Sequence, residues 1–256
     1  MTPLGARRLG LHRRDLLAAT VSVLAFLSSA QAATLKGIPD WSPNGGSPPQ
    51  PVRPGPWQFF SPEEGAVVEA LVDRLIPPDP NTPGGKEAGC AVFIDRQLAG
   101  PYGDRQGQYL HGPFIKGTPE QGAQSAQNPS GLYRTGLAAL DRHCRSLSDH
   151  GQRTGRPFAE LDAGQQDEIL RGMEAGSVTL ESIDAKTFFQ QIVQDVQQGF
   201  FADPIYGGNK DMCAWKMIGF PGAHYDYRAW VGRHSERYPY PPVSIAGRPE
   251  WTPREE

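Results

Sequence analysis

The sequence has few cysteines, no large excess of charge of either sign, and no long apolar run. Its 256 residues carry a formal net charge of −3, and no basic block follows the N-terminus, so nucleic acid is not an expected partner. Beyond the first 32 residues, no stretch reaches the roughly 18 consecutive apolar residues of a membrane-spanning helix. Internal repeats and heptads are also absent, which excludes solenoids and coiled coils.

The usual motifs of catalysis and cofactor binding are missing as well. No Gly-x-Gly-x-x-Gly follows a predicted strand, no phosphate-binding loop is present, and the Cys-x-x-Cys-His motif of covalent haem does not occur. Three cysteines are too few to ligate an iron–sulfur cluster, and no Gly-x-Ser-x-Gly elbow is found. His143 and His150 could share a helix face, but two isolated histidines are more often solvated or capping groups than metal ligands. We therefore expect no catalytic, cofactor-binding or metal-binding residue in this chain.

Residues 1–32 have the features of an export signal. Arg13 and Arg14 precede a short apolar run, and Ala30 and Ala32 form an A-x-A cleavage pattern. The order His-Arg-Arg-Asp-Leu-Leu resembles the twin-arginine export signal, although an ordinary secretory signal also starts with basic residues. Twin-arginine export is the favoured prediction, and the mature chain is expected to start after Ala32.

Proline and glycine divide the remainder of the chain. The 25 prolines and 30 glycines follow no fixed period, which excludes collagen and predicts long irregular segments around a globular body. Residues 33–57 are interpreted as a Pro-rich arm, residues 58–232 as a helical domain and residues 233–256 as a Pro-rich tail. Because the arm and the tail contain too few apolar residues for a core of their own, we expect them to lie extended, partly on a partner.

Five helices are predicted within residues 58–232, and no alternating strand pattern occurs. The first follows Ser61, a favourable N-cap with proline after it, and ends before Pro77. The other four begin near Glu87, Ser130, Asp162 and Asp184. A long Gly/Pro/Gln loop, 100–129, separates the second helix from the third. The predicted fold is therefore all-α, with long extended segments and little or no sheet.

The segment 203–223 has no regular pattern but contains many aromatic residues and methionines. Its large apolar residues are Tyr206, Met212, Trp215, Met217, Ile218 and Phe220. One interpretation is a buried irregular loop; the other is a docking surface, because aromatic residues and methionine are enriched at interfaces. Both can hold at once. The residues predicted to contact a partner are Tyr206, Met212, Cys213, Trp215 and Phe220.

Several stretches resemble the gluconate 2-dehydrogenase subunit 3 family. They are Phe59-Phe60-Ser61, the Leu-Ile-Pro-Pro end of the first helix, residues 87–100, the Gly112-Pro-Phe loop, residues 200–209 and residues 215–222. The resemblance covers about 57 to 243, and its most specific part runs from Tyr-Gly-Gly-Asn to Gly-Phe-Pro-Gly. The family supplies the small subunit of membrane-associated, FAD-dependent sugar and sugar-acid dehydrogenases. Its partners are a flavin subunit and a multihaem cytochrome c, so FAD, iron–sulfur and haem c are expected in partner subunits only.

The resemblance implies a non-catalytic subunit that helps the flavin subunit to mature and to be exported. That role fits a twin-arginine signal on a chain without a cofactor motif, because the twin-arginine route carries folded proteins. It also implies a periplasmic location, with contact to the membrane only through the complex. The alternatives are a stand-alone exported enzyme with an unrecognised site and a structural protein on a lipid surface.

The three cysteines give a separate prediction. Thiols in an oxidising compartment tend to pair, and an odd number leaves one over. Cys90 lies at the start of the second predicted helix and Cys144 on the inward face of the third, and helices joined by a long loop commonly pack together. We therefore pair Cys90 with Cys144. Cys213 is predicted to bond a cysteine of the flavin subunit or to lie at that interface; the alternative is a buried free thiol.

Overall fold

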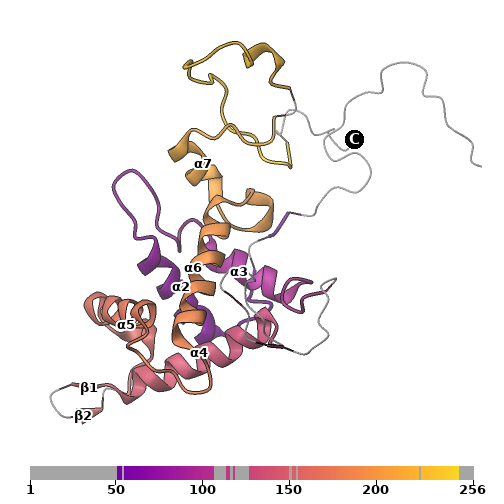
Figure 1. Ribbon diagram of the computed structural model, residues 1–256. Helices are drawn as coiled ribbons and strands as arrows, with labels where there is room; N and C mark the ends of the chain where they lie inside the picture. Colours follow the sequence, from indigo (N-terminus) through magenta and orange to yellow (C-terminus); the bar gives the residue numbers. More distant parts are fainter. Residues whose placement is uncertain are drawn as a thin grey trace, which may run out of the picture. The chain divides into compact units, whose positions relative to one another are not determined.

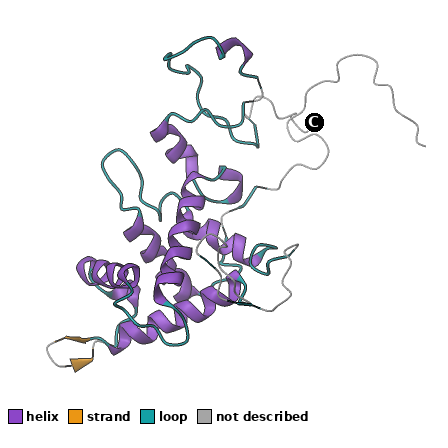
Figure 2. Ribbon diagram, viewed as in Figure 1, coloured by secondary structure: helices purple, strands orange, loops and turns teal. Residues whose placement is uncertain are grey.

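The computed structural model describes residues 51–53, 55–106, 114–115, 118, 127–149, 152–153, 155–224 and 226–247 (Figure 1). The predicted signal, with Arg13, Arg14, Ala30 and Ala32, and most of the predicted arm lie outside these residues, and the predicted domain boundaries stay predictions. The described helices are α2 (Pro62–Leu75), α3 (Cys90–Ala99), α4 (Pro129–Ser146), α5 (Ala163–Ala175), α6 (Ala185–Phe201) and α7 (Cys213–Ile218). Helices dominate this part of the chain (Figure 2), which confirms the all-α prediction.

Helix α2 begins and ends where local chemistry predicts. Ser61 and Glu64 form a capping box, in which the Glu64 N–H donates to the Ser61 hydroxyl and the Ser61 N–H donates to the Glu64 carboxylate. Pro62 occupies the first turn, where its missing N–H leaves no bond unmade. The helix stops before Pro77, and its apolar face is buried. The buried apolar residues of this face are Val67, Val68, Leu71 and Val72.

Other helix ends differ from the predictions. Helix α3 begins three residues later than expected, because Gly89 precedes it in the left-handed region at φ 82°. Helix α4 ends at Ser146 rather than near residue 150, and the chain continues into a small antiparallel pair, β1 (Ser148–Asp149) and β2 (Gln152–Arg153). Helix α7 was not predicted, since the regular pattern was expected to end after Pro204.

The core forms where α6 packs against the other long helices. Helix α6 contacts α2, α3, α4 and α5, and the rings of Tyr133 on α4 and Phe188 on α6 meet edge to face, with centroids 5.7 Å apart. Gly136 permits this approach, since a Cβ there would lie 2.5 Å from the Phe188 ring.

Among the described residues, no helix combines the length and the apolar character that crossing a bilayer requires.

Parts of the arm and tail pack on the chain's own body. In the arm, the Val52 N–H donates to the Ile205 carbonyl at 2.8 Å. At the other end, the Asp203 carboxylate accepts the Ser244 hydroxyl at 2.6 Å and the Ile245 N–H at 2.7 Å, and Val243 is buried. These short stretches belong to the folded body, which their composition did not predict.

Candidate functional site

The turn 207–212, which leads into α7, contains an unusual run of left-handed backbone. Asn209, Asp211 and Met212 have φ values of 46°, 55° and 57°, and Gly207 also has a positive φ. For a side chain such as Met212 this conformation costs roughly 1–2 kcal/mol. Such strain persists only where surrounding contacts enforce it, and it is concentrated at functional sites. The turn 207–212 is therefore a candidate functional surface whose backbone conformation is held by the surrounding fold.

Asn209 supplies the contacts that enforce the turn. Its side chain is fully buried; the amide nitrogen donates to the Ala202 carbonyl at 2.8 Å, and the amide oxygen accepts the Ala214 N–H at 2.9 Å. The neighbouring Lys210 N–H donates to the Ala88 carbonyl at 3.0 Å, before α3. One asparagine thus ties the end of α6 to the start of α7, and the next residue ties the turn to α3.

Helix α7 is buried on one side and exposed on the other. The Trp215 ring is buried, and its indole N–H donates to the Phe201 carbonyl at 2.9 Å. Met217, Ile218 and Phe220 are 51%, 58% and 44% exposed, although all three are large and apolar. We call these three residues the α7 surface. The buried Trp215 fixes the helix, so the α7 surface is presented on a rigid support.

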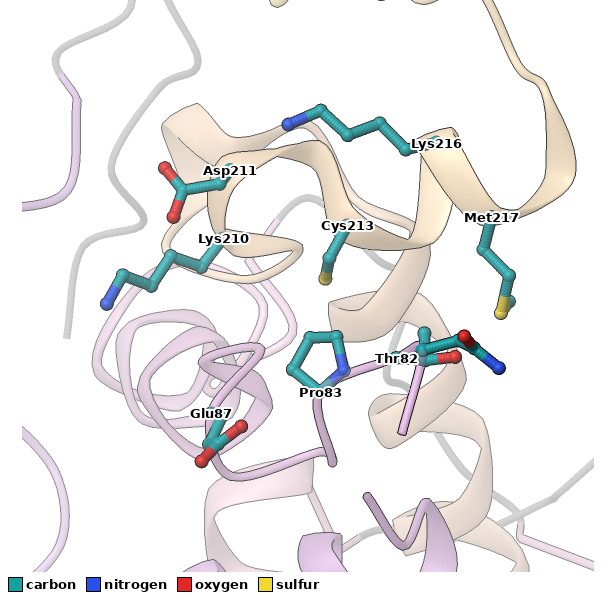
Figure 3. A pocket seen from close by; sticks show the side chains of 9 residues that line it. Thr82, Pro83, Glu87, Lys210, Asp211, Cys213, Lys216 and Met217 are labelled. Atoms are coloured by element: carbon teal, nitrogen blue, oxygen red, sulfur yellow. The ribbon is translucent and has the colours of Figure 1, made fainter. Parts of the chain in front are cut away.

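Two cavities flank the α7 surface. The first has a volume of about 790 Å³ (Figure 3) and is lined by Asn81, Thr82, Pro83, Glu87, Lys210, Asp211, Cys213, Lys216 and Met217. The second, of about 610 Å³, lies between Phe220 and the tail segment 237–242. Burial raises the pKa of the Cys213 thiol, so the thiolate of a nucleophilic cysteine is disfavoured in the first cavity. Both cavities have room for side chains of a partner.

The five residues predicted to contact a partner divide into three groups. Tyr206 and Phe220 are exposed, Met212 and Cys213 are half-buried, and Trp215 is buried. Met217 and Ile218, though part of the segment, were not among the predicted contacts, yet they are the most exposed large apolar residues of α7. Gly219, which ends α7 in the left-handed region, is the one sequence signal for this helix. Partner contact itself stays a prediction for all five.

The predicted cysteine pair is not formed in the structure. No disulfide bond joins Cys90, Cys144 or Cys213 to another of these cysteines, and the first two are buried. The bond between Cys90 and Cys144 therefore stays a prediction, and so does a bond from Cys213 to another subunit.

The described residues define a class of protein: a helical protein whose most distinctive surface is a short apolar helix held by a buried tryptophan. Within this part of the chain, no group of three or more His, Cys, Asp or Glu residues could hold a metal ion. The model of the family Gluconate 2-dehydrogenase subunit 3 matches residues 62–222, and the chain belongs to this family. Membership indicates an accessory subunit of a dehydrogenase complex. Comparisons with curated proteins and with solved structures gave no match.

Proposed function

We propose that this chain is the non-catalytic small subunit of a periplasmic, FAD-dependent sugar or sugar-acid dehydrogenase. It binds the flavin subunit through the α7 surface, assists its folding and escorts it through twin-arginine export. The multihaem cytochrome c is the third subunit of the complex, and the redox cofactors belong to the partners. The observation that carries the proposal is the α7 surface itself, because it lies inside the region matched by the family.

Burial of the α7 surface supplies a driving force for binding. Fully burying a side chain of this size contributes roughly 1.5–3 kcal/mol, and each of the three is about half exposed. Covering all three is therefore worth roughly 2–4 kcal/mol. Binding also stabilises the native partner by mass action, because a ligand that binds only the folded state shifts the folding equilibrium toward it. A chaperone role follows from this linkage without any catalytic step.

The export role is supported by the sequence of the signal. Arg13 and Arg14 match the twin-arginine pattern, and that route carries folded proteins. A chain without a cofactor motif has no cofactor of its own to take up before export. Export in the folded state is useful to it only if its partner must fold in the cytosol. An escorted flavin subunit would take up FAD in the cytosol and need no signal of its own.

Co-purification tests the docking proposal. The double variant Met217→Ser, Ile218→Ser is expected to retain its melting temperature, because both side chains are exposed, but to recover at least about tenfold less flavin subunit. Ile115→Ser is the matched control, since Ile115 is 67% exposed but lies in the loop after α3. Undiminished recovery with the double variant, or an equal loss with the control, contradicts docking through the α7 surface.

A further inference from the structure

The turn before α7 lies against the start of α3. The Lys210 N–H donates to the Ala88 carbonyl, and the Gly207 carbonyl approaches Gly89 so closely that a Cβ at Gly89 would lie 2.5 Å from it. Residues 88–89 and 207–210 are therefore in backbone contact. Cys90 is the first residue of α3 and Cys213 the first residue of α7, so this contact brings two helix starts, each with a cysteine, to the same place.

The Cys213 thiol is close enough to Cys90 to affect its titration. Burial raises the pKa of Cys90 to about 12, and the negative charge of a Cys213 thiolate contributes to that rise. For Cys144 the rise comes from burial and from Asp141, not from either of the other cysteines. Cys213 is the more accessible of the two thiols, because it is half-buried and its side chain lines the first cavity (Figure 3).

We infer that Cys90 and Cys213 are a dithiol that forms a disulfide bond within this chain and locks α7 onto α3. The oxidant is a disulfide-carrying compound, such as a thiol–disulfide oxidase or oxidised glutathione. The Cys213 thiolate attacks one sulfur of that disulfide, which gives a mixed disulfide and releases one thiol. The Cys90 thiolate then attacks the Cys213 sulfur and releases the second thiol. Two thiols are oxidised, one external disulfide is reduced, and the two protons end on the released thiols.

The proposed disulfide bond would hold helix α7, which carries the α7 surface. Helix α7 has only six residues, and noncovalent contacts such as the hydrogen bonds of Asn209 and Trp215 hold it in place. A covalent link to α3 removes the freedom of this segment to detach. The inference rests on the contact between α3 and α7 and holds whichever partner binds the α7 surface.

Disulfide mapping of the purified full chain tests the inference. The chain is oxidised with glutathione disulfide, free thiols are alkylated under denaturing conditions, and the peptides are analysed without reduction. We expect a linked pair of peptides that contain Cys90 and Cys213, with Cys144 alkylated. Linkage of Cys90 to Cys144, or a Cys213 that carries only glutathione, overturns the inference. In the complex, a bond from Cys213 to the flavin subunit also overturns it, whereas loss of flavin-subunit binding bears only on the proposed function.

Thermal melting gives a second measurement. Because the bond would close a long loop, oxidation is expected to raise the melting temperature by roughly 5–10 °C. Cys213→Ser should abolish this rise, and Cys144→Ser, the control variant, should keep it. Should Cys144→Ser fail to fold, the peptide map of the unsubstituted chain decides alone. The absence of any rise on oxidation contradicts the proposed lock.

Discussion

At the scale of single residues, Asp195 on α6 shows how the core accommodates a charge. Its carboxylate is buried and accepts hydrogen bonds from the hydroxyls of Tyr133 and Tyr102 at 2.9 Å and from the Gln191 amide at 3.0 Å. Burial raises the pKa of Asp195, and the three hydrogen bonds offset part of that rise. Burial also raises the pKa of Tyr133, which keeps its hydroxyl protonated as a donor.

This arrangement predicts a pH-dependent difference between Asp195→Asn and the unsubstituted chain. Because the folded-state pKa is raised, the stability that Asp195 contributes is fully present below its unfolded pKa and is lost as the pH rises through the folded pKa. Urea unfolding should therefore show Asp195→Asn gaining stability relative to the unsubstituted chain over the pH range above about 4, the ordinary pKa of aspartate. A relative loss over that range would contradict the raised pKa.

Asp195→Leu serves as the contrasting variant. It removes both acceptor oxygens and leaves the fully buried Tyr133 hydroxyl without its partner. An unsatisfied buried group costs about 1–3 kcal/mol, so this variant should be less stable than Asp195→Asn at every pH. Equal stability of the two would mean that the hydrogen bonds contribute nothing.

At the scale of elements, the sequence predicted the helices whose ends carry capping residues. Helices α2 and α5 both start with a capping box, and their buried faces follow from a 3.6-residue period. Helix α7 was not predicted because it has only six residues and because its N-cap, Met212, makes no side-chain capping bond. The many aromatic residues and methionines of segment 203–223 indicated a buried loop or a docking surface. Composition alone does not show which residues of a short helix face the core. The burial of Trp215 depends on the Phe201 carbonyl, which is distant in sequence.

The position of α7 should depend on Asn209. Asn209→Ala removes two hydrogen bonds and places an alanine in the left-handed region, so we expect a loss of about 2–4 kcal/mol in the free energy of unfolding. Asn209→Gly loses the same bonds but tolerates the backbone conformation, so it should be less destabilising by about 1 kcal/mol. Urea denaturation measures both. If the glycine variant is the less stable of the two, the strain assigned to this turn is wrong.

At the scale of the whole molecule, the family match and the α7 surface concern the same stretch of chain. The matched region ends at residue 222, just after Phe220, and it contains the whole buried core cluster of the described residues except Phe60. Under the proposed function, the helical body, the short apolar helix α7 and the predicted export signal together make a subunit that carries a partner. The resemblance seen in the sequence identified the family, whereas the exposed residues of the α7 surface could be located only with the structure.

The distribution of the flavin subunit between cytosol and periplasm tests the central claim most directly. The flavin subunit is expressed with this chain, and its amount and bound FAD are measured in each fraction. With Arg13→Lys, Arg14→Lys, both subunits should stay in the cytosol. With Met217→Ser, Ile218→Ser, this chain should reach the periplasm while the flavin subunit stays behind. A flavin subunit that reaches the periplasm undiminished with either variant would contradict the escort.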